Sequence, residues 1–319
     1  CPPPLERIGF KCTEMRKTHS GSDILKSVNA EDSIAERAHA VKVLNSAESK
    51  KDFFDHAVSV LDHFSSNASF RPYFVQRELR GSPEALGVFD DEHGASRAYY
   101  LMELADGSLS GMPLDDFRRH AREYLRQMLC GLNLLAKEGF VHGDITRGNI
   151  LVFGGAAASR PAQLKLADLD AAFVPQARAG DAGRHGGRFG RVRQAYSRLA
   201  PEVLSAHLAD LGAEVRLDHR HDVHVLGQTL LAAAGGPSSE EVQAEVEAVV
   251  AAVLGGGAAD AVGALWSEEN VQGLVSAALG EEDAAVVSAL RAMLRASPSE
   301  RCSAAECLAM AGFDAERSC

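Results

Sequence analysis

The sequence lacks the features that define several large classes of protein. No uninterrupted apolar run reaches the roughly 18 residues that a membrane-spanning helix needs. The nearest candidate, residues 248–265, is interrupted by three consecutive glycines and by Asp260. The six cysteines are too few for a disulfide scaffold, and no internal repeat is present. Membrane-spanning, collagen-like, coiled-coil and disordered classes are therefore excluded.

Positive charge is also scarce. The chain has 33 Lys and Arg against 44 Asp and Glu, which gives a formal net charge of −11 at pH 7. A nucleic-acid or anionic-membrane partner would need a strong local basic patch, and the one basic stretch holds only two aromatic residues, Phe189 and Tyr196. We therefore expect no nucleic-acid partner. What remains is an ordinary soluble composition, 46% hydrophobic and 24% charged, in 319 residues that suffice for one large domain or two lobes.

The cysteines show no metal-ligand spacing and no CxxC motif. They are Cys1, Cys12, Cys130, Cys302, Cys307 and Cys319. Their even number fits either structural disulfides in an oxidising compartment or free buried thiols. Cys302 and Cys307 could close a small loop, and we expect at least one intrachain disulfide that involves this C-terminal group. Because the chain starts at Cys1 rather than Met, we expect it to be trimmed, with any signal peptide removed.

Helical periodicity dominates the chain beyond residue 113. Apolar residues recur at three- and four-residue spacing from Phe117 to Leu135, which predicts an amphipathic helix. Residues up to about 105 are mixed in composition and include an amphipathic stretch at 47–64. The two regimes predict two parts of unequal character. Four further helices are predicted at 222–234, 239–254, 268–279 and 283–295.

The most informative segment is residues 140–153, which predict a short strand, a polar loop and an apolar strand. Within the loop, Asp144 and Asn149 lie five residues apart, and a second predicted strand ends at Asp168. Phosphoryl transfer needs a carboxylate that orients or deprotonates the attacking hydroxyl, and hard oxygen ligands for Mg²⁺. Asp144 suits the first role, while Asn149 and Asp168 suit the second. The alternative is that these residues only form local turns in two hairpins.

In these motifs the chain resembles a protein kinase, from about residue 38 to residue 312. The run from His142 through Asn149 is similar to the catalytic loop, and Asp168-Leu169-Asp170 is similar to the metal-binding DFG triplet. The resemblance implies a bilobal α+β protein-kinase-like fold. Its small β-containing N-lobe would cover residues 1–105, with 1–37 as a divergent extension in place of the glycine-rich loop. Its large α-helical C-lobe would cover 106–319, and both lobes would form one domain.

Further landmarks of the family follow in the expected order. Lys42 stands where the phosphate-binding lysine lies, and Glu103-Leu104-Ala105 after Met102 resembles the hinge that holds adenine. Ala200-Pro201-Glu202 matches the APE signature, whose Glu pairs with a late Arg of the family. By resemblance the site residues are catalytic Asp144 and Lys42; cofactor-binding Lys42, Met102, Glu103 and Ala105; metal-binding Asn149 and Asp168; and structural Glu202, Asp222 and Arg301.

The N-terminal part departs from the family pattern. A kinase carries a glycine-rich loop whose backbone N–H groups cover the phosphates, yet only Gly9 and Gly21 precede Lys42. Residues 30–37 predict a helix there, with Asn29 available as its N-cap. The lysine's usual Glu partner is also missing from the stretch at 47–64. Asp55 or Asp62 could substitute, with one methylene less reach.

Three departures fall within the active-site motifs. Thr146 replaces the Lys that stabilises charge on the transferring phosphoryl group, a loss of about 3 kcal/mol or a hundredfold in rate. Asp170 replaces the glycine of the triplet and adds a carboxylate beside the expected metal site. Gly143 replaces the Arg that would read a phosphorylated activation loop. Even so, Lys42 and the three predicted loop and metal residues are all present.

The absence of a glycine-rich loop makes the chain similar to the with-no-Gly-loop branch of secreted apicomplexan rhoptry and dense-granule kinases. That resemblance implies secretion into a parasitophorous vacuole or cyst wall. The function it favours is a pseudokinase with weak or absent phosphotransfer that binds or scaffolds a protein partner. One alternative is a divergent active Ser/Thr kinase that acts on secreted proteins; another is a small-molecule phosphotransferase. The cofactors are ATP and Mg²⁺ if nucleotide binding is retained, and otherwise none.

Two other groups of residues have alternative interpretations. A Gly- and Arg-rich stretch at 178–198 is either a docking site for an acidic or phosphorylated partner or a flexible solvated loop. His219, His221 and His224 have no Cys nearby to complete a zinc site, so we expect surface or core histidines rather than metal ligands.

Overall fold

The structure is a computed structural model of the 319-residue chain. It describes residues 1–7, 10–17, 22–29, 38–45, 51–77, 85–154, 160–174, 199–209, 217–237, 239–254, 261–279, 283–313 and 319. The chain divides into two compact units, Cys1–Asp106 and Gly107–Cys319, each of which is described by itself.

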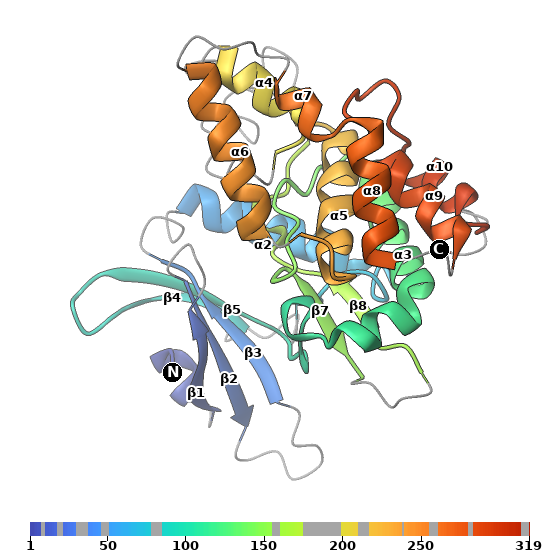
Figure 1. The fold of residues 1–319 in the computed structure, drawn as a ribbon. Helices are drawn as coiled ribbons and strands as arrows, with labels where there is room; N and C mark the ends of the chain where they lie inside the picture. The colour runs from blue at the N-terminus through green and yellow to red at the C-terminus, as the bar shows by residue number, and fades with distance from the viewer. Residues whose placement is uncertain are drawn as a thin grey trace. The chain divides into compact units, whose positions relative to one another are not determined.

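The first unit is built on a five-stranded antiparallel sheet (Figure 1). Its strands are β1 (Phe10–Lys17), β2 (Asp23–Asn29), β3 (Ala38–Val43), β4 (Leu86–Asp90) and β5 (Ser96–Glu103), in the order β1-β2-β3-β5-β4. The central strand β3 is almost entirely buried, since every residue from His39 to Val43 is buried and only Ala38 is partly exposed. Lys42 lies in this strand, paired with Ile24 of β2 and Tyr100 of β5.

Two helices and a disulfide complete the first unit. The short helix α1 (Pro3–Arg7) adds Leu5 to a core with Phe10, Val41 and Tyr99, and the Cys1–Cys12 disulfide joins the start of the chain to β1. Helix α2 (Lys51–Ser66) covers most of the stretch at 47–64 that was predicted to be amphipathic. Its Phe64 packs against Phe70 and Phe74, with ring centroids 5.5 and 4.7 Å apart.

The segment before residue 38 contributes β1 and β2, which the sequence did not predict. Both strands mix polar and apolar residues, so no apolar run marks them. The two strands form an antiparallel hairpin. Residues 18–21, and residues 30–37, where a helix was predicted, lie outside the described residues.

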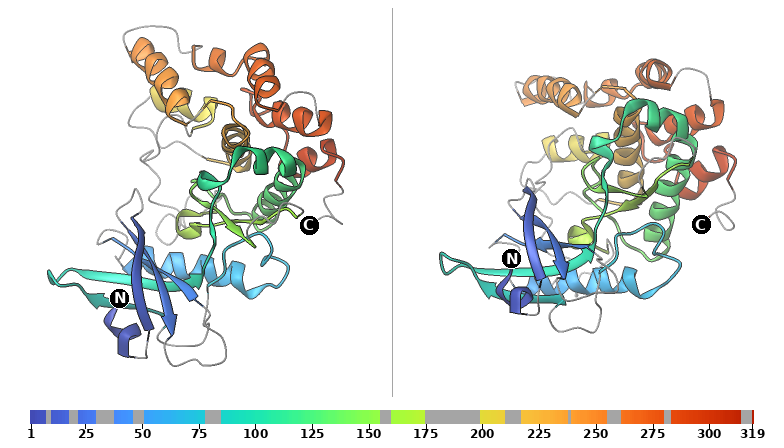
Figure 2. Two further views of the ribbon diagram at one scale, coloured as in Figure 1. Left: turned by 60° about the horizontal axis from the view of Figure 1, so that its bottom comes forward. Right: turned by 90° about the horizontal axis from the view of Figure 1, so that it is seen from below.

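The second unit is mainly helical. Its long helix α3 (Leu114–Lys137) packs against α5 (His219–Ala233), α10 (Ala304–Met310) and strand β8 (Gln163–Leu166), as Figure 2 shows. Strand β8 pairs with β7 (Ile150–Phe153), which pairs with β6 (Gly107–Ser108). The other helices are α4 (Pro201–Ala209), α6 (Ser239–Leu254), α7 (Ala261–Leu265), α8 (Glu268–Leu279) and α9 (Ala284–Met293).

The helices predicted in this half are confirmed. Helices α6 and α8 have the predicted bounds, whereas α5 begins three residues earlier, at His219, because Asp218 is its N-cap. The Asp218 carboxylate accepts hydrogen bonds from the backbone N–H groups of Arg220 and His221. An N-cap of this kind satisfies donors that the first turn of a helix leaves without partners.

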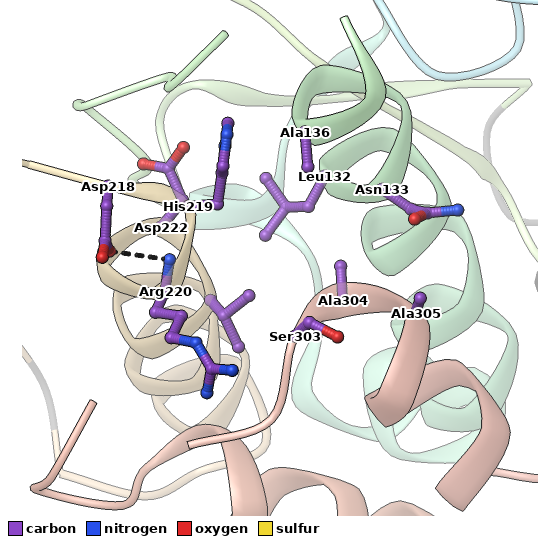
Figure 3. A pocket seen from close by; sticks show the side chains of 11 residues that line it. Leu132, Asn133, Ala136, Asp218, His219, Arg220, Asp222, Ser303, Ala304 and Ala305 are labelled. Atoms are coloured by element: carbon purple, nitrogen blue, oxygen red, sulfur yellow. Dashed lines mark hydrogen bonds between the residues drawn. The ribbon is translucent and has the colours of Figure 1, made fainter. Parts of the chain in front are cut away.

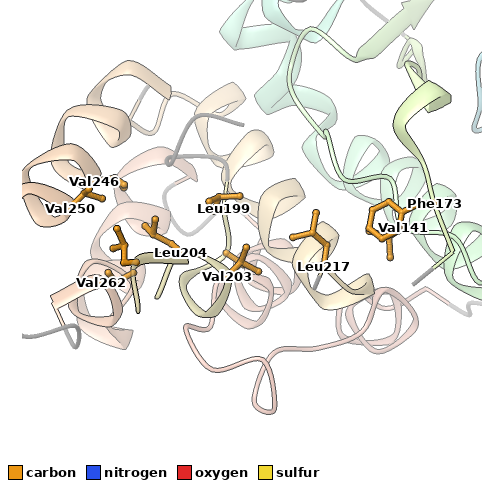
Figure 4. Packing of buried hydrophobic residues seen from close by; sticks show 11 residues of the cluster. Val141, Phe173, Leu199, Val203, Leu204, Leu217, Val246, Val250 and Val262 are labelled. Atoms are coloured by element: carbon orange, nitrogen blue, oxygen red, sulfur yellow. The ribbon is translucent and has the colours of Figure 1, made fainter. Parts of the chain in front are cut away.

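A cluster of buried apolar side chains ties the candidate catalytic loop to the helices that follow it (Figure 4). Val141 and Phe173 pair as a β-bridge on either side of the predicted loop and triplet. The cluster extends from Leu199 through α4 to α6 and α7. Its remaining members are Ala200, Val203, Leu204, Leu208, Leu217, Val246, Val250 and Val262.

All six cysteines are paired. The three disulfides are Cys1–Cys12, Cys130–Cys319 and Cys302–Cys307. The prediction of at least one intrachain disulfide that involves the C-terminal cysteines is confirmed. Within the described part of the chain, no helix is long and apolar enough to cross a membrane.

Candidate active site

The predicted catalytic loop holds Asp144 and Asn149 in direct contact. The Asn149 side-chain amide donates to the carboxylate Oδ2 of Asp144 at 3.1 Å and to its backbone carbonyl at 2.9 Å. Both side chains are half-buried, so the carboxylate stays accessible while its position is fixed. The loop therefore presents one oriented carboxylate, which phosphoryl transfer requires of a residue that positions a hydroxyl.

His142 lies beneath this carboxylate and is fully buried. Its Nδ1 accepts from the backbone N–H of Asp144 at 3.3 Å, and its Nε2 lies 3.0 Å from the carbonyl of Ala167. These two contacts require the neutral tautomer that carries its proton on Nε2. His142 thus connects the loop to the residue before Asp168. The sequence motif contained His142, but nothing in the sequence indicated this connection.

Asp168 follows β8 beside the loop. The backbone N–H of Ala167 donates to the carbonyl of Asn149 at 2.8 Å, which brings the two predicted metal ligands onto neighbouring segments. Asp168 is the one non-glycine residue with positive φ among the residues described, at φ 65° and ψ 46°. Strain of this kind persists where the surroundings fix it and gathers at functional sites. The carboxylate is half-buried, whereas Asp170, two residues later, is 3% exposed.

Asp222 braces the loop from the first turn of α5. Its two carboxylate oxygens accept from the backbone N–H groups of His142 at 2.7 Å and Gly143 at 3.0 Å. Burial raises the pKa of the Asp222 carboxyl, and the two backbone donors oppose that rise. The bonds require a turn in which Gly143 has φ +75°, a backbone conformation that residues other than glycine rarely adopt.

Glu202 and Arg301 form the ion pair that the resemblance implied. Each carboxylate oxygen of Glu202 accepts from a different guanidinium nitrogen of Arg301 at 2.8 Å. The Arg301 side chain is fully buried and also donates to the carbonyls of Arg295, Arg220 and Ala296, each at 3.0 Å. The pair fixes the start of α4 against the segment before α10, and the bond to the Arg220 carbonyl links that segment to the start of α5.

Thr146 occupies the position where a cation was expected by resemblance. Its hydroxyl and its carbonyl oxygen both accept from the backbone N–H of Asn149, at 3.2 and 3.0 Å. The side chain therefore stabilises the turn of the loop and brings no positive charge to it.

The other predicted site residues lie in the first unit. Lys42 is 6% exposed on β3. The two candidate carboxylates on α2 hold other cations: Asp55 pairs with Lys51, and Asp62 accepts from Arg77 at 2.6 Å. This arrangement gives both carboxylates a role within α2 and the segment that follows it.

The predicted hinge lies at the end of β5. Met102 forms a β-bridge with Arg77, and the backbone N–H of Glu103 donates to the carbonyl of Gln76 at 3.0 Å. The Glu103 carboxylate accepts from the backbone N–H of Gln76 at 2.7 Å, so this side chain is directed toward Gln76. Ala105 follows, half-buried, before the first unit ends at Asp106.

A cavity of about 270 Å³ lies on the other side of Asp222. Its walls come from α3 and from the starts of α5 and α10. Leu132, Ala136 and Ala304 face its centre, as Figure 3 shows. Among the polar groups at its edge, Asp218 caps α5 and Ser303 caps α10 in a capping box with Glu306, whereas the buried side-chain nitrogen of Asn133 has no hydrogen-bond partner in the described part of the chain. The Arg220 guanidinium donates to the carbonyls of Pro298 and Arg301.

The three histidines near α5 are core or half-buried residues. His221 and His224 are 1% and 0% exposed, and His219 is half-buried at the cavity wall. Among the described residues, no three His, Cys, Asp or Glu side chains lie close enough to hold a metal ion by themselves. The Gly- and Arg-rich stretch at 178–198 lies outside the described residues.

No family model matches the sequence, and no curated protein matches it. Among solved structures, the chain is similar to the MAP kinase LmaMPK10 from Leishmania major. The TM-score is 0.55 and the sequence identity 15%, over 96% of this chain and 83% of that chain. At this identity the likeness shows the fold alone. The fold is a kinase-like bilobal α+β fold, with an antiparallel sheet in the small lobe and a helical large lobe, as the sequence predicted.

Proposed function

We propose that the chain is a secreted pseudokinase: a binding or scaffolding module with weak or absent phosphotransfer. The observation that carries the proposal is Thr146, whose hydroxyl caps the backbone N–H of Asn149 at 3.2 Å. A cation at this position would stabilise the charge that develops on a transferring phosphoryl group, and one such contact is worth about 3 kcal/mol. The buried Asp170 supports the proposal because it puts a carboxylate in place of the triplet's glycine, two residues after the predicted metal ligand Asp168.

The residues present are compatible with ATP and Mg²⁺. Asp168 offers a half-buried carboxylate, and the Asn149 amide nitrogen is bonded to Asp144, which directs the amide oxygen elsewhere. Both are hard oxygen donors of the kind that Mg²⁺ prefers. Lys42 would bind phosphate, and the backbone from Met102 and Glu103 to Ala105 would bind adenine. If bound, Mg²⁺ would neutralise part of the negative charge of the phosphates.

A second candidate function is a divergent active Ser/Thr kinase. It is favoured by the bond between Asp144 and Asn149, which orients the carboxylate that would accept or position a substrate hydroxyl. A small-molecule phosphotransferase is less well supported, because those enzymes share the core of the fold but lack the segment that ends in Glu202 and its Arg301 partner.

Thermal shift and phosphate transfer distinguish these functions. The intact chain would be melted with and without Mg²⁺-ATP, then incubated with γ-labelled ATP and a Ser/Thr protein substrate. We expect at most weak transfer, unchanged in Asp144→Ser. The matched control, Asp115→Ser, changes an exposed carboxylate at the start of α3. Strong stabilisation by Mg²⁺-ATP, with transfer that disappears in Asp144→Ser but persists in Asp115→Ser, would establish the active kinase instead.

Secretion is supported by the three disulfides, since such bonds persist in oxidising compartments and are rare in the cytosol. The vacuole or cyst wall follows from the family resemblance. Epitope-tagged protein localised by immunofluorescence tests this part of the proposal, and retention in the cytosol would contradict it.

A further inference from the structure

Helix α5 carries two buried histidines that the proposed site does not use. His221 and His224 lie three residues apart, so they project from the same side of the helix. Their exposed fractions are 1% and 0%. A histidine is the side chain whose charge changes most readily between pH 5 and 8. Two of them in a protein interior make that interior sensitive to acid.

His221 holds the segment that leads into α4. The backbone N–H of Ala200 donates to Nδ1 of His221 at 3.4 Å, and both residues are buried. An imidazole nitrogen accepts a hydrogen bond only when it carries no proton. The contact therefore exists only with neutral His221, protonated on Nε2. Its partner Ala200 lies two residues before Glu202.

Charged groups around His221 oppose a second positive charge. Arg301, fully buried and paired with Glu202, acts on both histidines, while Asp218 at the N-cap of α5 partly opposes it. Burial, followed by the Arg301 charge, lowers the pKa of His221 from 6.5 to about 4. Burial, Arg301 and His221 lower the pKa of His224 well below its ordinary value.

His224 is held by different contacts. Its ring packs edge-on against Trp266, with centroids 5.0 Å apart, and its Nε2 lies 3.2 Å from the side-chain nitrogen of Gln228. These neighbours belong to the next turn of α5 and to the residues between α7 and α8. Of the two histidines, His221 is the one bonded to the segment before α4.

We propose that His221 is an acid-sensitive latch, which anchors Leu199–Glu202 at neutral pH and releases this segment when the imidazole is protonated. The proton would remove the acceptor of the Ala200 N–H group and place a positive charge near Arg301. Repulsion from that charge would also weaken the hydrogen bonds that the Arg301 guanidinium donates to Glu202 and to the carbonyl of Arg220. This regulation does not depend on whether the chain transfers phosphate.

The size of the acid effect on anchoring, and the pH range over which it acts, follow from the lowered pKa of His221. Above pH 6.5 His221 is neutral whether the segment is anchored or released, and the latch is fully effective. As the pH falls from 6.5 to 4, protonation favours the released state, and below 4 the effect is complete. The pKa of His221 is 6.5 when the segment is released and about 4 when it is anchored, a difference of about 2.5. Full protonation therefore lowers the equilibrium constant for anchoring by about 300-fold at most.

Hydrogen exchange of the intact, disulfide-bonded chain tests the latch. Protection factors corrected for intrinsic exchange would be measured at pH 7.5, 5.5 and 4.5 for residues 199–209 and for α9 as an internal reference. We expect protection of 199–209 to fall with pH before that of α9. His221→Asn, whose Oδ1 can replace Nδ1 as the acceptor, should keep protection nearly constant. His219→Asn, the same substitution in the same turn, should retain the acid response.

Three results would overturn the proposal: equal loss of protection in 199–209 and α9, an unchanged acid response in His221→Asn, or loss of the response in His219→Asn. If His221→Asn fails to fold, NMR titration of the wild-type His221 ring decides the matter. A ring that stays neutral until the pH falls below about 5, and whose protonation accompanies loss of the Ala200 N–H bond, supports the latch. A ring that titrates near 6.5 without change at Ala200 overturns it.

Discussion

Arg301 and Glu202 lie 99 residues apart in the sequence and meet in a two-pronged ion pair, with both N···O distances at 2.8 Å. The three other hydrogen bonds of the Arg301 guanidinium go to backbone carbonyls, so all five of its N–H donors are used. Only a planar guanidinium can donate to these five acceptors at once, so lysine is a poor replacement for Arg301.

Arg301→Lys should lower the free energy of unfolding by about 3–5 kcal/mol, because it breaks a buried pair and leaves backbone carbonyls without donors. Denaturant unfolding at neutral pH measures this loss. The matched control is Arg295→Lys, since Arg295 pairs with Glu268 at an exposed site where such pairs contribute about 0–1 kcal/mol. Equal effects of the two substitutions would show that the buried pair is not a main support of the fold.

Gly143→Ala should destabilise the protein by about 1–2 kcal/mol, because its φ of +75° strains any residue that has a Cβ. The added methyl would lie 3.4 Å from the Phe173 ring, an ordinary contact, so the cost comes from the backbone. Gly273→Ala is the control. Gly273 is exposed in α8, and no atom lies within 4 Å of the place that an added methyl would take, so Ala there should stabilise by about 0.5–1 kcal/mol. Thermal melts that rank the two variants in the opposite order would contradict this explanation of the loop.

Thr146→Lys should raise phosphate transfer by about a hundredfold if the missing cation is what limits it. The loop should survive the change, since the carbonyl of residue 146 still accepts from the Asn149 N–H. Transfer from γ-labelled ATP measures the gain, and Thr146→Ser, which keeps the hydroxyl, should show none. A rate that stays at background in Thr146→Lys, with Mg²⁺-ATP bound, would place the defect elsewhere.

The disulfides should contribute unequally. Replacing Cys130 and Cys319 by Ala opens a loop closed over 189 residues and should cost about 5 kcal/mol by loop entropy, against about 2 kcal/mol for the Cys302–Cys307 pair, five residues apart. Chemical unfolding of the two double variants compares them, with the same Cys→Ala change in both. A larger loss from the short loop would show that local structure, rather than chain entropy, sets these contributions.

Much of the helical lobe could be predicted because, in a long amphipathic helix, apolar residues recur every three or four positions in the sequence. Helices α6 and α8 are examples, whereas α7 and α10, five and seven residues long, offer too few turns for a period to show. Strands β1 and β2 were missed for a related reason: polar and apolar residues mix along them, and only pairing within the sheet, β1 with β2 and β2 with β3, makes them strands.

The candidate site was predictable where its parts are close in sequence. The five-residue spacing of Asp144 and Asn149 placed them in one loop, where the structure has them bonded. Contacts between segments that are distant in the sequence could not be predicted from residue spacing. The pairing of Glu202 with Arg301 was predicted only from the family resemblance. No sequence signal distinguished His221, which accepts a backbone bond, from His219 in the same turn, because burial is decided by which distant segments pack against each side of α5.

The Cys130–Cys319 bond has a consequence for proteolysis. It closes a covalent ring that contains the candidate catalytic loop, the triplet at Asp168 and helices α4 to α10. A single peptide-bond cut anywhere between these cysteines opens the ring without separating the pieces. A nicked molecule would therefore migrate as one species on a non-reducing gel and as two fragments after reduction. Cleavage within the ring changes the connectivity of the protein without releasing any part of it.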